Sequence, residues 1–353
     1  MAHYEFASLA RINASAFSCS AVIRSKPDYF QVDEQLPFEP DGEGGHVWLR
    51  IKKRNTNTDW LALELAKFAK VPSVAVGYAG MKDRHAITIQ WFSINMEGVT
   101  EPEWAEFETE DIQILEQTRH NKKLKRGVLL GNTFTLTLTE LSGDKQTWQT
   151  NLETIKQHGV PNYFAEQRFG HSAGNLVRAD HWFNTGKTPK KRNQRSIYLS
   201  AARSWLFNLV LNYRVQDKTW NTALIGDVML LAGTRASLFS ADLNNDDIKA
   251  RLSEMDIHPT GPLWGKGKQR VQAEAERLET TILQDWSTWR QGLEKAGLKQ
   301  ERRALRLFPQ NFDCRFLGTD QLKLCFYLPA GCYATAVMRE LAVISDASVI
   351  KRK

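Results

Sequence analysis

The chain has 353 residues, of which 42% are hydrophobic and 25% charged, so it can bury a sizeable core, and its length favours two domains. No stretch approaches the roughly 20 apolar residues of a membrane span, and the start lacks the apolar block of a secretory signal, so we expect a cytoplasmic protein. The formal charge of +7 favours a polyanionic partner, whereas the four cysteines match no zinc-binding spacing.

The first third of the chain predicts strands separated by a helix and tight turns. A helix is expected to begin at Asn57 or Thr58, either of which can cap it, and to end by Pro72. Alternating apolar and threonine residues over 132–139 predict a half-buried strand. Shorter extended segments are expected at 21–23, 30–34, 46–51, 74–76 and 87–94.

The middle of the chain has a different pattern, rich in charge and in helical periodicity. Beyond it a strand is expected at 321–328 and a helix at about 334–342. We therefore expect an α+β domain with a mostly antiparallel sheet flanked by helices, made of 1–158 and 308–353, and an inserted α/β domain, 159–307. The clearest helices of the insertion are expected at 200–214, 246–255 and 271–297.

Three clusters of basic residues sharpen the expectation of a polyanionic partner. Phosphate contacts by such side chains would make binding depend on salt concentration, although any one cluster could also be a solvated face. The clusters are 119–126; Lys187, Lys190, Lys191, Arg192 and Arg195; and Lys299, Arg302, Arg303 and Arg306.

The segment 77–85 is the strongest candidate for a chemical site. It places two glycines, Lys82, Asp83, Arg84 and a histidine between two apolar strands. Glycines allow close backbone approach, and functional residues often lie on loops braced by rigid elements. Asp83, between two cations, is favoured in its ionised form, which suits a nucleophile better than a general acid. Taken alone, the segment is equally compatible with a solvated, charged hairpin.

Gly80-Met-Lys-Asp-Arg-His-Ala86, followed by Gln90-Trp91, is one of a series of motifs spread along nearly the whole chain. The others include Arg24-Ser-Lys-Pro-Asp-Tyr-Phe30, Phe38-Glu-Pro-Asp-Gly-Glu-Gly44, Gly131-Asn-Thr-Phe134, Pro161-Asn-Tyr-Phe164, Pro262-Leu-Trp-Gly265 and Leu328-Pro-Ala-Gly331. In content and in order, these motifs resemble those of the tRNA pseudouridine synthase D (TruD) family. The motif Gly80-Met-Lys-Asp-Arg-His-Ala86 is similar to the family's catalytic motif.

This resemblance implies a pseudouridine-synthase-like catalytic domain and an isomerase that converts uridine to pseudouridine at position 13 of tRNA. Asp83 matches the family's nucleophile, and no cofactor or metal is implied. Because a uracil inside folded RNA is out of reach, we expect the base to be flipped into an aromatic-lined pocket. The expected partner is tRNA, without a membrane or a small-molecule cofactor, and the expected state is a monomer.

The resemblance also assigns roles to residues away from the Asp83 segment. Arg24 matches a basic residue expected to pair with Asp83. Asn132 would orient Asp83 by donating a hydrogen bond, although an asparagine after a glycine is also typical of a turn. The expected substrate-contacting residues are Phe30, Asn132, Phe134 and Tyr333.

Three positions depart from the family's pattern. Arg24 stands where lysine is usual, which keeps the charge but changes its geometry. Tyr333 stands where phenylalanine is usual, and its hydroxyl needs a partner. Ala165 stands in place of a glycine.

Three other functions compete with an isomerase. A non-catalytic RNA-binding protein would use the same basic surface but would not need Asp83. A methyltransferase would need a glycine-rich cofactor loop in a βαβ setting, and a metal-dependent nuclease would need clustered carboxylates or histidines; neither pattern is evident.

Overall fold

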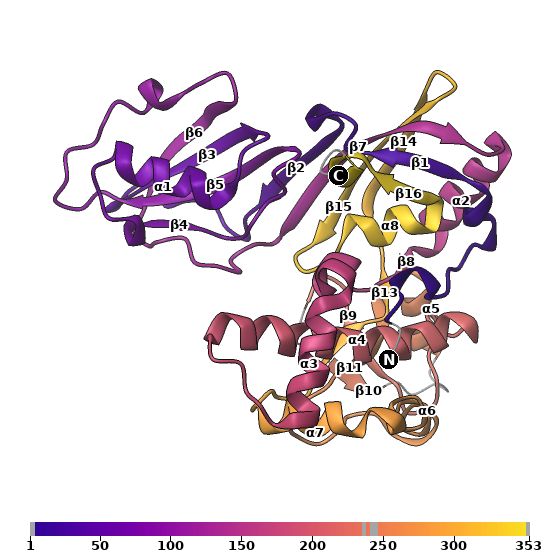
Figure 1. Cartoon of the computed structure of the whole chain (residues 1–353). Coiled ribbons are helices and arrows are strands. Elements are labelled where there is room, and N and C mark those ends of the chain that lie inside the picture. The colour runs from indigo at the N-terminus through magenta and orange to yellow at the C-terminus, as the bar shows by residue number, and fades with distance from the viewer. Residues whose placement is uncertain (1–3, 235–237, 241–245, 351–353) are drawn as a thin grey trace. The chain divides into compact units, whose positions relative to one another are not determined.

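The computed structural model describes residues 4–234, 238–240 and 246–350 (Figure 1). The chain divides into two compact units. We call Met1–Ala16, Gln149–Phe308 and Cys332–Leu341 unit 1, and Phe17–Trp148, Pro309–Gly331 and Ala342–Lys353 unit 2. No helix within the described ranges is long and apolar enough to cross a membrane.

Unit 2 is built on a ten-stranded sheet whose main path runs β14-β15-β7-β2-β5-β3-β6. Neighbouring strands are antiparallel except for the pairs β2–β5 and β1–β16, which confirms the expected mostly antiparallel sheet. The strands are β1 (Ser20–Ile23), β2 (Phe30–Gln35), β3 (His46–Arg54), β4 (Val76–Tyr78), β5 (Ile87–Asn95), β6 (Ile112–His120), β7 (Gly131–Ser142), β14 (Gln310–Leu317), β15 (Gln321–Pro329) and β16 (Val343–Asp346).

Helix α1 (Thr58–Phe68) covers one face of this sheet (Figure 1). The Asn57 side chain caps it by accepting hydrogen bonds from the first-turn amides, as the sequence predicts. Leu61 and Leu65 of the helix pack with Leu49 of β3 and Phe92 of β5 in the largest core cluster described for unit 2. The helix also packs against β4 and β5, the two strands that the candidate loop joins.

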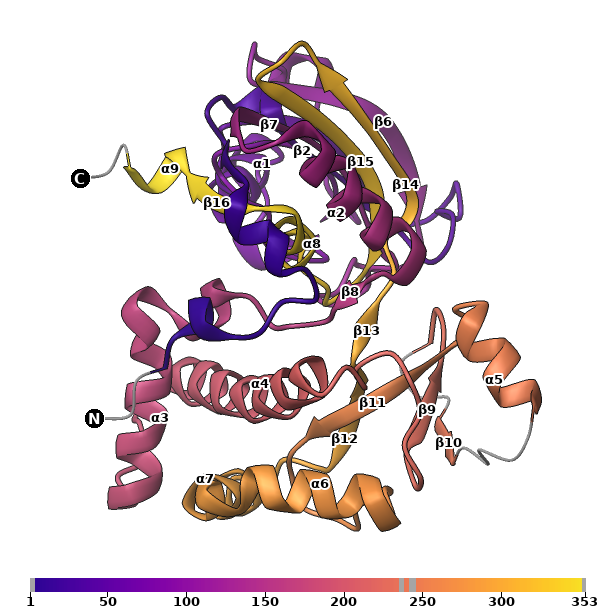
Figure 2. The same cartoon turned by 90° about the vertical axis from the view of Figure 1, so that its right-hand side faces the viewer.

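Unit 1 combines helices with a four-stranded antiparallel sheet of order β10-β9-β11-β12. Helix α3 packs beside α4, and α6 and α7 also contact α4 (Figure 2). The helices are α3 (Gly174–Thr185), α4 (Arg192–Gln216), α5 (Asp246–Ser253), α6 (Ala273–Leu283), α7 (Ser287–Lys295) and α8 (Ala334–Leu341), and the strands are β8 (Val160–Pro161), β9 (Val228–Leu231), β10 (Leu238–Ser240), β11 (Ile257–Leu263), β12 (Glu301–Ala304) and β13 (Arg306–Leu307). Two further helices are α2 (Lys145–His158), which contains the unit boundary at 148/149, and α9 (Ala347–Ile350) of unit 2.

Two sequence expectations are wrong in detail. The single helix expected at 271–297 is broken by a 3-10 turn, Gln284–Trp286, between α6 and α7. Leu283 and Trp289 are both buried but six residues apart, which is no helical repeat, so the break turns the apolar face of α7 back to the core. The strand expected at 74–76 begins only at Val76, after a 3-10 turn.

Candidate active site

The sheet of unit 2 places several candidate residues on one face, where β2 and β7 pair. Glu34 lies opposite Asn132 in this pairing, and Val32 lies opposite Phe134. Phe30 is two residues from Val32, so the period-2 geometry of a strand directs its side chain to the same face. Residues from two distant segments, Phe30 and Glu34 of β2 and Asn132 and Phe134 of β7, are thereby gathered beside the loop between β4 and β5.

Asp83 lies on that loop, and its carboxylate is held by Arg24. Arg24 Nη2 lies 2.8 Å from Asp83 Oδ2, and the two side chains are 5% and 50% exposed, respectively. A buried guanidinium therefore holds a half-exposed carboxylate, which stays accessible to a substrate. A hydrogen bond between two charged groups is among the strong ones, so it fixes the direction of the carboxylate as well as its charge.

Arg24 is itself fixed from two further sides. Its Nη1 lies 2.6 Å from Asp346 Oδ2, and its guanidinium lies over the Phe30 ring, 3.9 Å from the centroid. The backbone of Arg24 has a φ of 54°, in the left-handed region that a non-glycine residue rarely adopts. Strained backbone of this kind persists where surrounding contacts over-determine it.

Lys82, the residue before Asp83, points into the sheet face. Its Nζ lies 2.7 Å from Glu34 Oε2 and 2.6 Å from Asn132 Oδ1. The side chains of Lys82 and Glu34 are 6% and 0% exposed. Burial raises the pKa of Glu34, and the charge of Lys82 opposes that shift. The Lys82 ammonium is thus held by Glu34 and Asn132, on the sheet side of the loop.

The backbone of the loop is tied to the start of α1. The Lys82 amide donates to Thr58 Oγ1 at 3.1 Å, and the same hydroxyl donates to Gln90 Oε1 at 3.0 Å. The Gln90 amide group in turn donates to Gly80 O at 3.3 Å. Thr58 and Gln90 are fully buried, so the loop is anchored at Gly80 and Lys82, on one side of Asp83.

Lys53 is a second buried cation near Asp83, and the sequence interpretation did not identify it. It is 1% exposed, and its Nζ donates to Thr56 O at 2.6 Å. Burial lowers the pKa of Lys53 to about 8, while the negative charge of Asp83 acts in the opposite direction. The sequence did contain a signal, because Lys53 continues the buried alternation of Val47, Leu49 and Ile51.

The two aromatic candidates of unit 2 are largely buried. Phe30 is 2% exposed, with one ring face under the Arg24 guanidinium. Phe134 is 8% exposed and stacks on Phe326 of β15 at 5.6 Å between centroids. Their contact with a substrate base stays a prediction.

Tyr333, the remaining predicted substrate contact, belongs to unit 1. Its hydroxyl accepts hydrogen bonds from Arg168 Nε at 3.0 Å and Nη2 at 2.6 Å. The Tyr333 ring lies edge-on to Phe164, 6.2 Å between centroids. The tyrosine hydroxyl at this position therefore has the partner that it requires.

The three basic clusters differ in their surroundings. Lys122, Lys125 and Arg126 of the first cluster are exposed, as are most side chains of the second cluster, where α4 begins. The third cluster is not a solvated cationic face: Arg302 is buried against Glu279 Oε1 at 2.5 Å, and the Arg306 Nε donates to His258 Nδ1 at 3.0 Å. Arg302 and Arg306 are therefore not available for phosphate, because their charges are used inside unit 1, whereas Lys299 of the same cluster is exposed.

Within the described part of the chain, no group of three or more histidine, cysteine or acidic side chains is placed to hold a metal ion. The fold and the loop define an enzyme-like site in which an accessible carboxylate is fixed by a buried arginine on one face of a mostly antiparallel sheet.

Comparison with known proteins defines the family. The model of the family described as tRNA pseudouridine synthase D (TruD) matches residues 13–183 and 175–341. A tRNA pseudouridine synthase D from Nitrosococcus oceani is 48% identical over 330 residues, covering 93% of this chain and 92% of that protein. One from Xanthomonas oryzae pv. oryzae is 46% identical over 343 residues, covering 93% of each. The chain belongs to the tRNA pseudouridine synthase D (TruD) family.

A solved structure supports the fold. The crystal structure of a candidate tRNA pseudouridine synthase D from Methanosarcina mazei matches with a TM-score of 0.72 at 19% identity, over 94% of this chain and 95% of that one. At this identity the likeness concerns the fold, and it agrees with the α+β class expected from the sequence.

Proposed function

We propose that this protein isomerises the uridine at position 13 of tRNA to pseudouridine, with Asp83 as the nucleophile. The single observation that carries the assignment is the half-exposed Asp83 carboxylate, held at 2.8 Å by the buried Arg24 in a member of the TruD family. In the reaction the N1–C1′ bond breaks, the uracil turns, and a C5–C1′ bond forms. The hydrogen of C5 is lost as a proton.

Arg24 and Lys82 divide the task of placing the nucleophile. Arg24 engages Oδ2 of Asp83, so we assign the attack to Oδ1. Lys82 is bound to Glu34 and Asn132 on the sheet. These contacts fix the position of the neighbouring backbone of the loop relative to the sheet. Because such placement precedes the reaction, it lowers the barrier without reorganisation at the moment of attack. The carboxylate has two alternative targets, the base and the ribose, and this placement allows attack on either.

The flipped base is assigned to the aromatic residues beside this loop in unit 2. Phe30 and Phe134 supply ring faces, and Asn132 supplies a polar group for a base edge. Tyr333 of unit 1 stays a substrate contact that the family resemblance implies. Arg24 is a catalytic residue in this scheme because it contacts the reacting carboxylate. For the base to stack on Phe30 or Phe134, that ring must become more exposed than it is in the structure, where the two residues are 2% and 8% exposed.

We assign the catalytic domain to 1–158 and 308–353, and the inserted TruD-type domain to 159–307. The protein acts as a cytoplasmic monomer on tRNA. The exposed Lys190, Lys191 and Arg192 bind the phosphate backbone, so their neutralisation weakens tRNA binding and flattens its salt dependence.

The position-specific test uses tRNA transcripts that lack modifications. After incubation with the enzyme, carbodiimide treatment and primer extension map pseudouridine along the transcript. The expected result is one new stop that reports position 13, absent when that uridine is replaced by cytidine. Pseudouridine at another position would contradict the site assignment, whereas binding without any pseudouridine would favour the non-catalytic RNA-binding alternative.

A further inference from the structure

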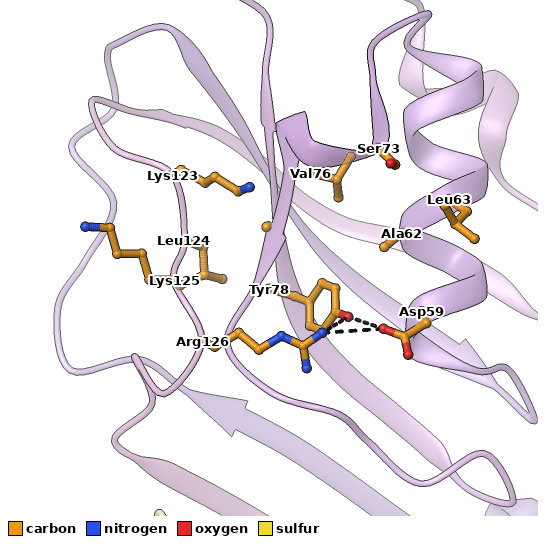
Figure 3. A pocket seen from close by; sticks show the side chains of 11 residues that line it. Asp59, Ala62, Leu63, Ser73, Val76, Tyr78, Lys123, Leu124, Lys125 and Arg126 are labelled. Carbon is orange, nitrogen blue, oxygen red and sulfur yellow. Dashed lines mark hydrogen bonds and ion pairs between the residues drawn. The ribbon is translucent and has the colours of Figure 1, made fainter. Parts of the chain in front are cut away.

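Unit 2 contains a pocket of about 590 Å³ that is separate from the Asp83 carboxylate (Figure 3). It lies between α1, β4 and the segment 123–126. Its volume is within the range of small-molecule sites, roughly 300–1,000 Å³. Apolar side chains form part of the wall, among them Ala62 and Leu63 of α1, Val76 of β4 and Leu124.

Three cations line the opposite wall of the pocket: Lys123, Lys125 and Arg126. The Lys123 ammonium points into the pocket, whereas the Lys125 ammonium points away from it (Figure 3). Arg126 lies over the Tyr78 ring, 4.5 Å from its centroid, and also contacts the Tyr78 hydroxyl (Figure 3). The hydroxyl donates to Asp59, the one acidic side chain of the lining. Burial and this bond raise the pKa of Tyr78 to about 12, so the phenol stays neutral and the lining has a net charge of about +2.

The cationic segment is held in place by its backbone. The Leu124 amide donates to Ser93 Oγ at 2.9 Å, and the Gly127 amide donates to Ala79 O at 2.7 Å. The segment also passes close to Gly77. A glycine is required at that position, because a Cβ there would lie 2.3 Å from Leu124 O. The pocket is thus preorganised between two flanking anchors, which lowers the cost of ordering it around a ligand.

The pocket also adjoins the Asp83 loop along the chain. Tyr78 precedes Asp83 by five residues, a span of at most about 17 Å in extended chain. On the α1 side, Asp59 follows Thr58, whose hydroxyl binds the Lys82 amide. A ligand in the pocket would therefore lie within reach of a nucleotide chain that enters the Asp83 site.

We propose that this pocket binds a second nucleotide of the RNA substrate, near the uridine that is modified. This inference rests on the proposed function. The phosphate is bound by Lys123 and Arg126, and the base or ribose lies against the apolar wall formed by Leu63 and Leu124 (Figure 3). The Arg126–Asp59 pair, 3.6 Å apart, is exposed on both sides, and such pairs contribute little, so Arg126 can exchange Asp59 for a phosphate.

The pocket combines cations with an apolar wall, and this combination favours RNA over a free anion. A free anion would need only the cations, whereas a nucleotide also uses an apolar surface, and base stacking or contact adds to phosphate binding. The cations belong to the cluster 119–126, of which Lys122 is exposed just outside the pocket, so a continuing phosphate backbone has a further contact.

The test compares two exposed leucines of unit 2. Leu63, in the pocket, is 48% exposed, and Leu115, on β6 outside it, is 47% exposed. Leu63→Glu and Leu115→Glu change the net charge equally, so they separate a local effect from a general one. We expect Leu63→Glu to weaken tRNA binding by about tenfold and Leu115→Glu by less than about twofold, as read by filter binding at several salt concentrations. Equal effects of the two variants would overturn the proposal.

A second pair of variants removes charge instead of adding it. Lys123→Ala with Arg126→Ala is expected to reduce the slope of log affinity against log salt by about one, because the two cations together neutralise one phosphate. Arg315→Ala with Lys323→Ala, two exposed cations paired across β14 and β15, is the control and is expected to leave the slope unchanged. An equal fall in both slopes would show diffuse attraction and contradict a pocket.

Crosslinking separates this inference from the proposed function. Transcripts carrying 4-thiouridine are irradiated with the full-length enzyme, and crosslinked peptides are identified by mass spectrometry. We expect crosslinks at Tyr78 or Leu124 that are lost in Leu63→Glu. Crosslinks there without pseudouridine formation would leave the pocket standing and refute the activity. Pseudouridine formation without crosslinks there, and with unchanged affinity of Leu63→Glu, would refute the pocket alone.

Discussion

Asp83 lies near two buried cations that differ in how far the sequence reveals them. Arg24 follows a short strand and is matched by a family motif, so its pairing with Asp83 could be predicted before the 2.8 Å contact was seen. Lys53 has no motif, and only its phase in the buried alternation of β3 marks it. Asp346, which fixes Arg24, lies 322 residues after it, and no local pattern reports a contact over that separation.

The buried pair of Glu34 and Lys82 gives a stability prediction at the same scale. Glu34→Gln or Lys82→Met leaves one buried charge without its partner, so each is expected to lower the free energy of unfolding by about 3 kcal/mol. The double variant removes both charges and should recover much of that loss. Urea unfolding of the four proteins measures the coupling, and single losses that simply add would contradict it.

Lys53 gives a prediction about pH. The pKa of Lys53 is lowered to about 8 by burial, below its ordinary value of about 10.5, so the folded protein releases this proton before the unfolded chain does. The contribution of Lys53 to stability therefore rises with pH across that window.

Lys53→Met removes this titration and serves as the reference protein. Relative to it, the wild type should gain about 2 kcal/mol in free energy of unfolding between about pH 7.5 and about pH 9.5. Urea unfolding of both proteins across this range measures the difference. A constant difference would show that Lys53 has an ordinary pKa.

At the scale of elements, periodicity predicted what is local and failed where tertiary packing decides. The capped start of α1 was predictable because Asn57 bonds to amides two and three residues away. The break between α6 and α7 was not, because it depends on which face of α7 the core of unit 1 requires. By composition, Arg302 and Arg306 look like surface residues. They are buried because their hydrogen-bond partners, Glu279 and His258, lie inside unit 1.

The cap of α1 is open to a direct test. Asn57→Ala removes the acceptor for two first-turn amides and should lower the free energy of unfolding by about 1 kcal/mol. Asn57→Asp keeps an acceptor and adds a charge that the helix N-terminus favours, so it should cost little. Hydrogen exchange at the amides of Asp59 and Trp60 reports the effect, and equal exchange in both variants would count against the cap.

At the scale of the whole molecule, unit 1 is assembled from three separate stretches of chain. The Arg339 guanidinium donates to Leu9 O at 2.7 Å and to Ala10 O at 3.1 Å, and Glu340 Oε2 accepts from the Ile12 amide at 2.9 Å. Hydrophobic periodicity predicts that α8 has a buried face, but it cannot say which segment covers that face. The pairing of residues 9–12 with α8 in unit 1 is therefore visible only in the structure.

Removal of the first twelve residues tests this assembly. It removes the Leu9 and Ala10 acceptors of buried Arg339 and the Ile12 donor of Glu340, and it takes Leu9 out of the core, so unit 1 should lose at least about 3 kcal/mol. Hydrogen exchange should quicken in α4 of unit 1 and change less in β5 of unit 2, which serves as the internal control. Unchanged protection of α4 would contradict the role given to the N-terminal segment.

The most direct test of the central claim measures tritium release from tRNA labelled at uracil C5. Forming the C5–C1′ bond must expel that hydrogen, so release reports pseudouridine formation itself. The wild type is expected to release tritium, whereas Asp83→Asn, which keeps the shape of the side chain but not its charge, is expected to release none. Release by Asp83→Asn at the wild-type rate would contradict the role of Asp83, and no release by the wild type would contradict the proposed function.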